Sequence, residues 1–297
     1  MHNTLQSKYG IPGSVTLAEE IIGMPKVALT HRSGSSAEIY IQGAHITSWK
    51  DHRGEERLFL SRMSEFIPRH PIRGGIPVVF PQFGDGPLPK HGFARVADWQ
   101  LSGSSVSDDG DVSIILTLGD SEPTRRIWDF RFSLEMIVTL GADSLSVRMS
   151  VANTGDDPFD FQIALHTYFA VSDIHSAAVC GLDGVEYLDA LQDRLRLTEP
   201  HLGVTFDGEL DRIYLSTPDR LVITDGAGRK RMLIGKRGMP DAVVWNPWIE
   251  KSIRLADFGD DEYRQMVCVE TGAVVPGITL SPKERWTGET VLMAENG

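Results

Sequence analysis

Two polar side chains in otherwise apolar runs have the chemistry for general acid and base catalysis. His166 lies in residues 161–169, a strand-like run in which alternate side chains share one face. Histidine is the usual proton donor near pH 7. Glu270 ends the apolar run 266–270, just before a glycine turn, and a buried carboxylate needs partners or a rim position. A hydrogen-bonded core histidine and a structural salt bridge are the alternative interpretations.

A third segment has the composition of an anion-binding loop. In residues 72–84, Arg73 is followed by two glycines and then by an apolar stretch that contains Pro77 and Pro81. The glycines permit close approach of a ligand, and a guanidinium can bind a phosphate or carboxylate bidentately. The prolines argue against a regular central strand. A tight structural turn with a surface arginine is the alternative interpretation.

Two further segments have the side chains expected at a sugar-phosphate site. Residues 88–95 place Lys90, His91 and Arg95 within six positions, which suits an anion, although a solvated basic loop is the competing interpretation. Residues 244–248 hold two tryptophans beside an asparagine. Indole rings stack on sugar C–H faces and an amide can bind hydroxyls. Plain core tryptophans are the alternative.

The elements that must position these residues are predominantly strands. Segments rich in Val, Ile, Thr and aromatic residues alternate apolar with polar side chains, which is typical of strands with one buried face. They cover residues 37–41, 112–118, 132–140, 145–151, 161–169, 221–224, 231–234, 266–270 and 289–293. Residues 225–230 predict a hairpin. Helical periodicity is weak, and no long amphipathic segment could form a βαβ crossover, so antiparallel sheets are predicted.

Composition excludes several classes of partner. The 297 residues carry a formal net charge of -12, which argues against nucleic acid or an anionic membrane as the partner. Cys180 and Cys268 are interpreted as free thiols of a reducing compartment rather than as a disulfide or zinc ligands. The first residues lack a secretory signal, and no apolar run approaches 18 residues, so a cytoplasmic protein is expected.

The sequence shows neither a domain boundary nor any of the common catalytic sequence motifs. No linker or repeat is found, so a single domain of residues 1–297 is predicted. There is no GxGxxG, GxxxxGK[ST], HExxH or GxSxG pattern. Nucleotide binding and serine-hydrolase chemistry therefore lose their usual support.

Taken together, the segments resemble the glucose-6-phosphate 1-epimerases, the hexose-6-phosphate branch of the aldose 1-epimerase superfamily. The resemblance extends along nearly the whole chain. It rests on the order and spacing of residues 43–49, 72–77, 81–84, 91–95, 165–169, 244–248 and 267–270. Two departures stand out: residues 271–274 replace a small-residue run that commonly ends in asparagine, and Lys90 precedes His91.

The resemblance implies an all-β fold, a galactose-mutarotase-like antiparallel β-supersandwich with few short helices. It implies an enzyme, expected to be a monomer without metal or cofactor, that interconverts the anomers of a hexose 6-phosphate, foremost glucose 6-phosphate. His166 would be the general acid and Glu270 the general base. The implied substrate-binding residues are Arg73 and Arg95 for the phosphate, His91 and Asp211 for the sugar, and Gln82 in the same pocket.

Anomer exchange independently requires such a pair. A base removes the C1 hydroxyl proton while an acid protonates the ring oxygen, and the open aldehyde recloses after rotation about C1–C2. The two groups are expected on opposite sides of the sugar. The rival classes are a carbohydrate-binding module, a mutarotase of unphosphorylated sugars and a sandwich-type polysaccharide lyase or hydrolase. A lectin needs no histidine–glutamate pair, and an unphosphorylated substrate needs no arginine pair.

Overall fold

The computed structural model describes residues 2–21, 23–226 and 230–296, and its strands form three sheets in which all pairings of named strands are antiparallel. The first has four strands, β1 (Val15–Ile21), β2 (Met24–Thr30), β3 (Ser36–Tyr40) and β4 (His45–Lys50). The second has nine strands, in spatial order β15 (Gly203–Val204), β12 (Ala178–Cys180), β17 (Arg220–Asp225), β18 (Lys230–Arg237), β21 (Arg285–Asn296), β9 (Ser144–Asn153), β8 (Phe132–Leu140), β7 (Val112–Gly119) and β6 (Gln100–Val106).

The third sheet has eight strands and carries the candidate site. In spatial order they are β14 (Leu195–Thr198), β13 (Glu186–Asp189), β16 (Leu210–Tyr214), β19 (Asp241–Asn246), β20 (Met266–Leu280), β10 (Phe159–Leu165) and β5 (Val78–Val79), with β11 (Tyr168–Ala170) also paired to β20. The helices are short: α1 (His2–Tyr9), α2 (Glu122–Ile127), α3 (Trp248–Arg254) and the 3-10 turns η1 (Ala94–Val96), η2 (Ile174–Ser176), η3 (Ala190–Gln192) and η4 (Glu262–Gln265).

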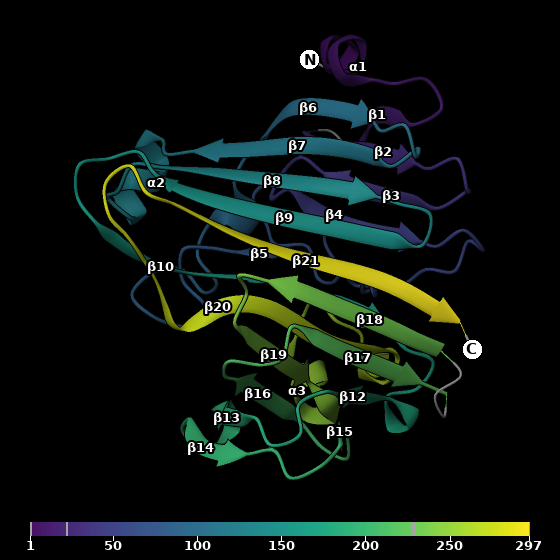
Figure 1. The fold of residues 1–297 in the computed structure, drawn as a ribbon, viewed down its shortest axis with the longest axis vertical. Helices are drawn as coiled ribbons and strands as arrows, with labels where there is room; N and C mark the ends of the chain where they lie inside the picture. Colours follow the sequence, from purple (N-terminus) through teal and green to yellow (C-terminus); the bar gives the residue numbers. More distant parts are fainter. Residues whose placement is uncertain (1, 22, 227–229, 297) are drawn as a thin grey trace.

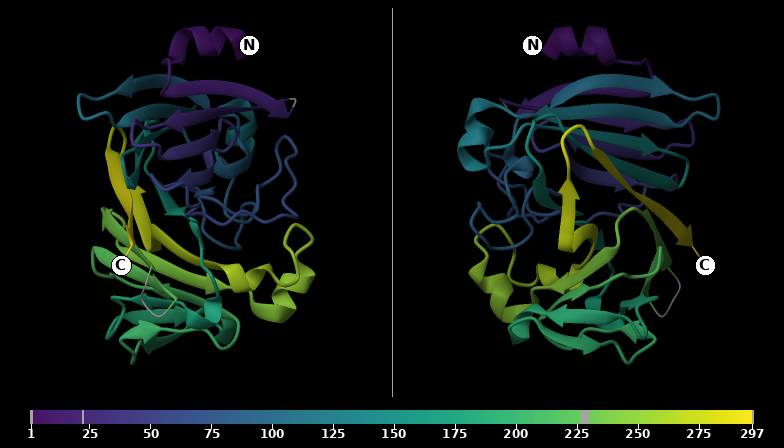
Figure 2. Two further views of the ribbon diagram at one scale, coloured as in Figure 1. Left: turned by 90° about the vertical axis from the view of Figure 1, so that its right-hand side faces the viewer. Right: turned by 60° about the vertical axis from the view of Figure 1, so that its left-hand side comes forward.

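The sheets are stacked as a sandwich. Figure 1 shows the nine-stranded sheet across the front, with the four-stranded sheet behind its upper part and β16 and β19 behind its lower part. Figure 2 shows β20 and β21, coloured yellow, running between the upper and lower halves of the molecule. The predicted all-β antiparallel sandwich with few short helices is confirmed.

Alternation of apolar side chains explains how the strands form a core. Along β8, every second residue from Phe132 to Leu140 is buried and the residues between them are partly exposed. Burial of one face stabilises a strand by about 25 cal/mol for each Å² of apolar surface removed from water. These side chains share one core with Val27, Ile39 and Trp49 of the four-stranded sheet.

The eight-stranded sheet is covered on both faces around β19. All six residues of β19 are buried. Val244 belongs to the main core, whereas Val243 packs with Ile213 and Ala164 in a smaller cluster. Ile213 also lines the cavity described below. The candidate site therefore borders this smaller cluster.

Most predicted strands coincide with observed ones, but the strand predicted over residues 161–169 is wrong as a continuous element. β10 ends at Leu165 and β11 begins at Tyr168, so His166 and Thr167 lie outside both ladders. The predicted hairpin is confirmed in its strands, which pair up to Asp225 and Lys230, while residues 227–229 lie outside the described residues. Of the helices described, none is long and apolar enough to cross a membrane.

Candidate active site

His166 and Glu270 meet because β10 and β20 pair beside them. The ladder joins Leu165 to Thr271, so the next residue, His166, leaves β10 opposite Glu270. The Nδ1 atom of His166 lies 3.2 Å from Oε1 of Glu270. Neither His166 Nδ1 nor Glu270 Oε2 has a hydrogen-bond partner among the described residues, although both side chains are buried. Unpaired buried polar atoms cost free energy, which a ligand that bonds to them would recover.

This arrangement corrects the expectation that the acid and the base lie on opposite sides of a sugar. The two groups are neighbours, separated by 3.2 Å. The C1 hydroxyl and the ring oxygen of a hexose are bonded to the same carbon atom. Adjacent groups can therefore reach both oxygens from one edge of the ring.

Backbone geometry fixes the position of Arg73. Gly75 has φ +63°, and a Cβ atom there would lie 2.1 Å from the carbonyl oxygen of Ile46, so no other residue fits. The preceding carbonyl, that of Gly74, accepts a hydrogen bond of 2.8 Å from Nε2 of the buried His45. The glycine pair therefore lies tightly against β4 and sets where the Arg73 side chain begins.

The guanidinium of Arg73 is held on two sides. Its Nε donates to Oδ2 of Asp257 at 3.1 Å, Nη2 lies 3.1 Å from Oδ1, and Nη1 donates to the Tyr168 hydroxyl at 3.2 Å. Burial by itself would lower the pKa of Arg73, but Tyr168 and Asp257 raise it above its usual value. Arg73 is a permanent cation whose charge Asp257 partly balances.

Arg95 is the less neutralised cation. It lies on η1, and its Nη2 donates to the Lys90 carbonyl oxygen at 2.7 Å. No carboxylate among the described residues forms an ion pair with it, whereas Lys90 Nζ pairs with Asp85 at 3.2 Å. Burial, the largest influence, lowers the pKa of Arg95. A desolvated guanidinium without a carboxylate is well suited to bind an anion.

His91 presents a neutral hydrogen-bond donor. Residue 91 has φ +62°, an uncommon conformation outside glycine, and such strain is concentrated at functional sites. Its Nδ1 accepts a hydrogen bond from the Gly84 amide at 3.3 Å, so the proton is on Nε2. Burial, together with the charges of Arg95 and Lys90, lowers the pKa of His91 to about 3. The ring centroid lies 5.4 Å from that of His166.

Asp211 and Trp245 are brought together by the pairing of β16 with β19, in which they lie directly opposite each other. Lys251 of α3 lies beside both: its Nζ is 3.9 Å from Asp211 Oδ2 and 5.9 Å from the centre of the Trp245 ring. The same Nζ donates to Oε1 of Glu209 at 2.7 Å. Burial raises the pKa of Asp211, and the Lys251 charge offsets part of this rise.

Two predicted contacts are placed elsewhere. Gln82 is not among the described residues that line the cavity, because its amide donates to the carbonyl oxygens of Gly84 and Leu88 at 3.2 and 3.1 Å and accepts from the Leu88 amide at 3.0 Å. Asn246 is buried and donates to backbone carbonyls of residues 263 and 266 at 2.9 Å. The side-chain amides of Gln82 and Asn246 therefore form hydrogen bonds with the backbone instead of facing the cavity.

The remaining predicted side chains line one cavity of about 750 Å³, within the range of small-molecule sites. Its lining residues are Arg73, Phe83, Gly84, Asp85, Lys90, His91, Arg95, His166, Ala190, Asp193, Arg194, Asp211, Ile213, Trp245, Lys251, Leu255 and Glu270. Five of them are Lys or Arg and four are Asp or Glu, in a chain with 29 basic and 41 acidic residues. The cavity is therefore enriched in positive charge.

The electrostatics of the acid–base pair are dominated by burial. Burial lowers the pKa of His166 well below its usual value, and the positive charges of Arg73 and Arg95 lower it further. Burial raises the pKa of Glu270 well above its usual value, with a further rise from Asp211. Both groups therefore favour their neutral forms, in which Glu270 holds the proton.

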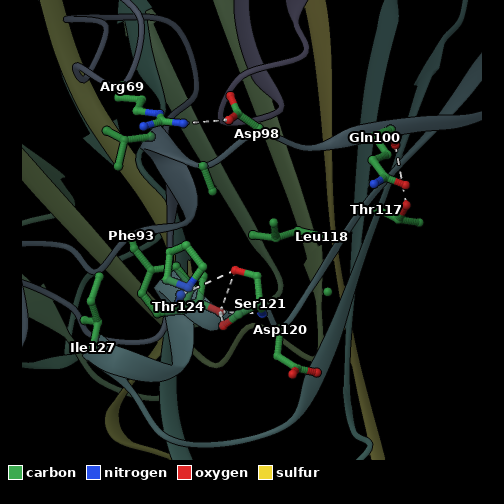
Figure 3. A pocket seen from close by; sticks show the side chains of 14 residues that line it. Arg69, Phe93, Asp98, Gln100, Thr117, Leu118, Asp120, Ser121, Thr124 and Ile127 are labelled. Atoms are coloured by element: carbon green, nitrogen blue, oxygen red, sulfur yellow. Dashed lines mark hydrogen bonds and ion pairs between the residues drawn. The ribbon is translucent and has the colours of Figure 1, made fainter.

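A second hollow, of about 680 Å³, lies beside α2 and is shown in Figure 3. Arg69 and Asp98 face each other there, with 3.8 Å between Nη2 and Oδ2. Ser121 and Thr124 are joined by hydrogen bonds at the start of α2. The described lining contains no histidine and none of the predicted site residues. It therefore lacks the neighbouring histidine and glutamate found in the first cavity.

Several cavity residues escaped sequence analysis. Lys251, Asp193 and Arg194 line the cavity, and Asp257 holds Arg73. They come from α3 and from loops whose sequences carry no recognisable motif. Their only signal is charge, which is indistinguishable from that of an ordinary solvated surface.

The fold is a β-sandwich whose cavity contains a buried histidine beside a buried glutamate. The family model for aldose 1-epimerase matches residues 25–293, and the chain belongs to the aldose 1-epimerase family, whose enzymes are isomerases. A Cenchrus ciliaris protein named "Putative glucose-6-phosphate 1-epimerase" is 42% identical over 280 residues, covering 92% of this chain and 85% of the relative. An Escherichia coli K12 protein of the same name is 37% identical over 238 residues, covering 79% of each chain.

Solved structures agree with this assignment. A crystal structure described as "a putative mutarotase" from Salmonella typhimurium superposes with a TM-score of 0.89 and 27% identity, over 97% of this chain and 96% of the other. The predicted family and the mutarotase-like fold are thus confirmed.

Proposed function

We propose that this protein interconverts the α and β anomers of a hexose 6-phosphate, foremost glucose 6-phosphate. The observation that carries the proposal is the contact between His166 and Glu270, 3.2 Å apart, in a cavity that also holds two arginines. The names of the relatives from Cenchrus ciliaris and Escherichia coli support the choice of substrate. The positive charge of the cavity supports an anionic one.

The pair supplies both proton transfers of ring opening. One group takes the proton of the C1 hydroxyl while the other gives a proton to the ring oxygen as its bond to C1 breaks. The aldehyde rotates about C1–C2, and the reverse transfers close the ring on the other face. Proton number is conserved because the pair shares one proton throughout, and each group typically contributes about 10²–10⁴-fold in rate.

Substrate binding would redistribute that proton. The phosphate brings negative charge to Arg73 and Arg95, the cations that lower the pKa of His166. Its arrival therefore favours movement of the shared proton from Glu270 to His166. In the complex His166 is then the acid for the ring oxygen and Glu270 the base for the C1 hydroxyl, with reversed roles on closure.

The other cavity residues are assigned to binding. Arg95, which has no carboxylate partner in the described part of the chain, supplies most of the charge for the phosphate, and Arg73 supplies fixed N–H donors. His91 offers its Nε2 proton and Asp211 its carboxylate to sugar hydroxyls. Gln82 acts indirectly, by holding the loop between Gly84 and Leu88.

Exchange between the two anomers of glucose 6-phosphate tests this function. The protein should accelerate the exchange above the buffer rate, and more for glucose 6-phosphate than for glucose or galactose at equal concentration. Anomer-resolved NMR measures all three. A carbohydrate-binding module would bind sugars yet leave every exchange rate at its buffer value, and faster exchange of glucose than of its phosphate would indicate a mutarotase of unphosphorylated sugars.

A further inference from the structure

Tyr168 lies between the proposed phosphate ligand and the proposed catalytic histidine. Its hydroxyl accepts a hydrogen bond from Nη1 of Arg73 at 3.2 Å. Its ring stacks on the ring of His166, with centroids 4.8 Å apart and planes inclined by 12°. Tyr168 is 2% exposed and is not among the described residues that line the cavity. Tyr168 therefore contacts both Arg73 and His166 but does not itself line the cavity.

We propose that Tyr168 is a positioning residue that fixes Arg73 and His166 relative to each other, so that a hexose held by its 6-phosphate presents its anomeric carbon to His166. This inference rests on the proposed function and deepens it. Positioning of this kind contributes strongly to rate, because a misplacement of about 1 Å can cost about 10²-fold.

The surroundings of Tyr168 make it a rigid reference point. The residue pairs with Cys268 in the ladder of β11 with β20. Trp245 contacts its ring edge-on at 5.9 Å, and Phe59 stacks at 6.5 Å between centroids. A tyrosine has only two side-chain torsions, and packing on these sides fixes both. Burial raises the pKa of Tyr168, so its hydroxyl stays neutral.

Asp257 completes the support of Arg73 from the other side. A guanidinium has five N–H groups, and three of those on Arg73 face Asp257 or Tyr168. The remaining two have no partner among the described residues and can bind a phosphate, in an orientation that Asp257 and Tyr168 set. Loss of the Tyr168 hydroxyl removes one of the partners, while the ring that contacts His166 remains.

A positioning role for Tyr168 should matter for glucose 6-phosphate but not for glucose. A phosphorylated hexose depends on the distance between its phosphate site and the acid–base pair, whereas glucose has no phosphate to place. If Tyr168 couples these two sites, loss of its hydroxyl should impair catalysis on glucose 6-phosphate and spare catalysis on glucose. A tyrosine that served only the core would affect both sugars equally, through stability.

The test is anomer exchange by Tyr168→Phe, measured with glucose 6-phosphate and with glucose. We expect about a tenfold fall in kcat/KM for glucose 6-phosphate, from loss of one hydrogen bond to a charged group, and no change for glucose. Tyr214→Phe is the matched control, since it also removes a buried phenol hydrogen bond, 2.7 Å to Glu199, outside the described cavity lining. It should leave the selectivity unchanged.

A double-mutant cycle adds a measurement on glucose 6-phosphate alone. If Tyr168 acts through Arg73, then Tyr168→Phe should have no further effect in an Arg73→Ala background, so the two losses are non-additive. Arg73→Lys keeps the positive charge but lacks the planar guanidinium with its paired N–H donors. This variant should reproduce the selective loss of kcat/KM for glucose 6-phosphate. Thermal unfolding of each variant reports whether it folds.

Any of three outcomes would overturn the positioning role: equal losses for both sugars, no loss for either sugar, or fully additive losses in the cycle. These results are separable from failure of the proposed function, because that failure is seen in the wild-type protein, which would then leave glucose 6-phosphate exchange at the buffer rate.

Discussion

Replacement of Arg95 by alanine should separate phosphate binding from chemistry. Arg95 is half-buried, donates to one backbone carbonyl and has no carboxylate ion-pair partner among the described residues. A hydrogen bond to a charged group contributes about 1.5–3 kcal/mol. At about 1.36 kcal/mol for each factor of ten, KM for glucose 6-phosphate should rise about 10–150-fold. The turnover number should change much less, because the acid–base pair is left in place.

Arg73 should contribute less to phosphate binding than Arg95. Asp257 balances part of the Arg73 charge, with Nη2 and Oδ1 3.1 Å apart, so Arg73→Ala should raise KM less than Arg95→Ala. Steady-state anomer exchange of glucose 6-phosphate, with glucose as the control sugar, measures both effects. Arg95→Lys should recover part of the loss because it restores a cation. An equal rise in KM for glucose, or no rise for the phosphate, would refute a phosphate-binding role for Arg95.

Two other predictions concern stability. Burial raises the pKa of Glu270 above the ordinary 4.5, so the folded protein keeps this proton to higher pH than the unfolded chain and loses stability as pH rises above about 4.5. The melting-temperature advantage of Glu270→Gln over wild type should therefore grow from pH 5 to pH 8; a pH-independent difference would show that Glu270 is ionised in the fold. Gly75→Ala should destabilise by about 3 kcal/mol or more, from a positive φ and a Cβ 2.1 Å from a carbonyl oxygen. Gly54→Ala, with φ +79° but nothing within 4 Å of the added Cβ, should cost only about 1–2 kcal/mol in chemical denaturation; equal costs would contradict the packing argument.

Local patterns predicted the parts of the fold that local physics determines. The alternation in β8 sets which residues face the core. Pro77 and Pro81 flank β5, which is only two residues long, because proline has no amide N–H to donate to a strand ladder. The interruption after β10 could not be predicted this way. In the sequence, His166 and Thr167 lie inside a continuous strand-like run, and their departure from the ladder depends on long-range pairing with β20.

In the candidate site, too, some features could be predicted from the sequence and others depend on long-range structure. Residue types and the family resemblance identified His166, Glu270, Arg73, Arg95, His91 and Asp211, and the structure gathers all six around one cavity. The contact between His166 and Glu270 follows from the register of strands about 100 residues apart in sequence, which no local pattern encodes. Gln82 belongs to the recognised motif, yet its amide is used by the loop, because motif membership does not reveal where a side chain points.

We infer that His166 and Glu270 together open the ring of a hexose 6-phosphate. Two-dimensional exchange NMR on equilibrium glucose 6-phosphate measures this directly, from the cross-peaks between its anomeric signals. Wild-type protein should speed the exchange, and His166→Ala and Glu270→Gln should each lower the enzymatic rate by about 10²–10⁴-fold while remaining folded. Wild-type exchange rates in either folded variant would contradict the account.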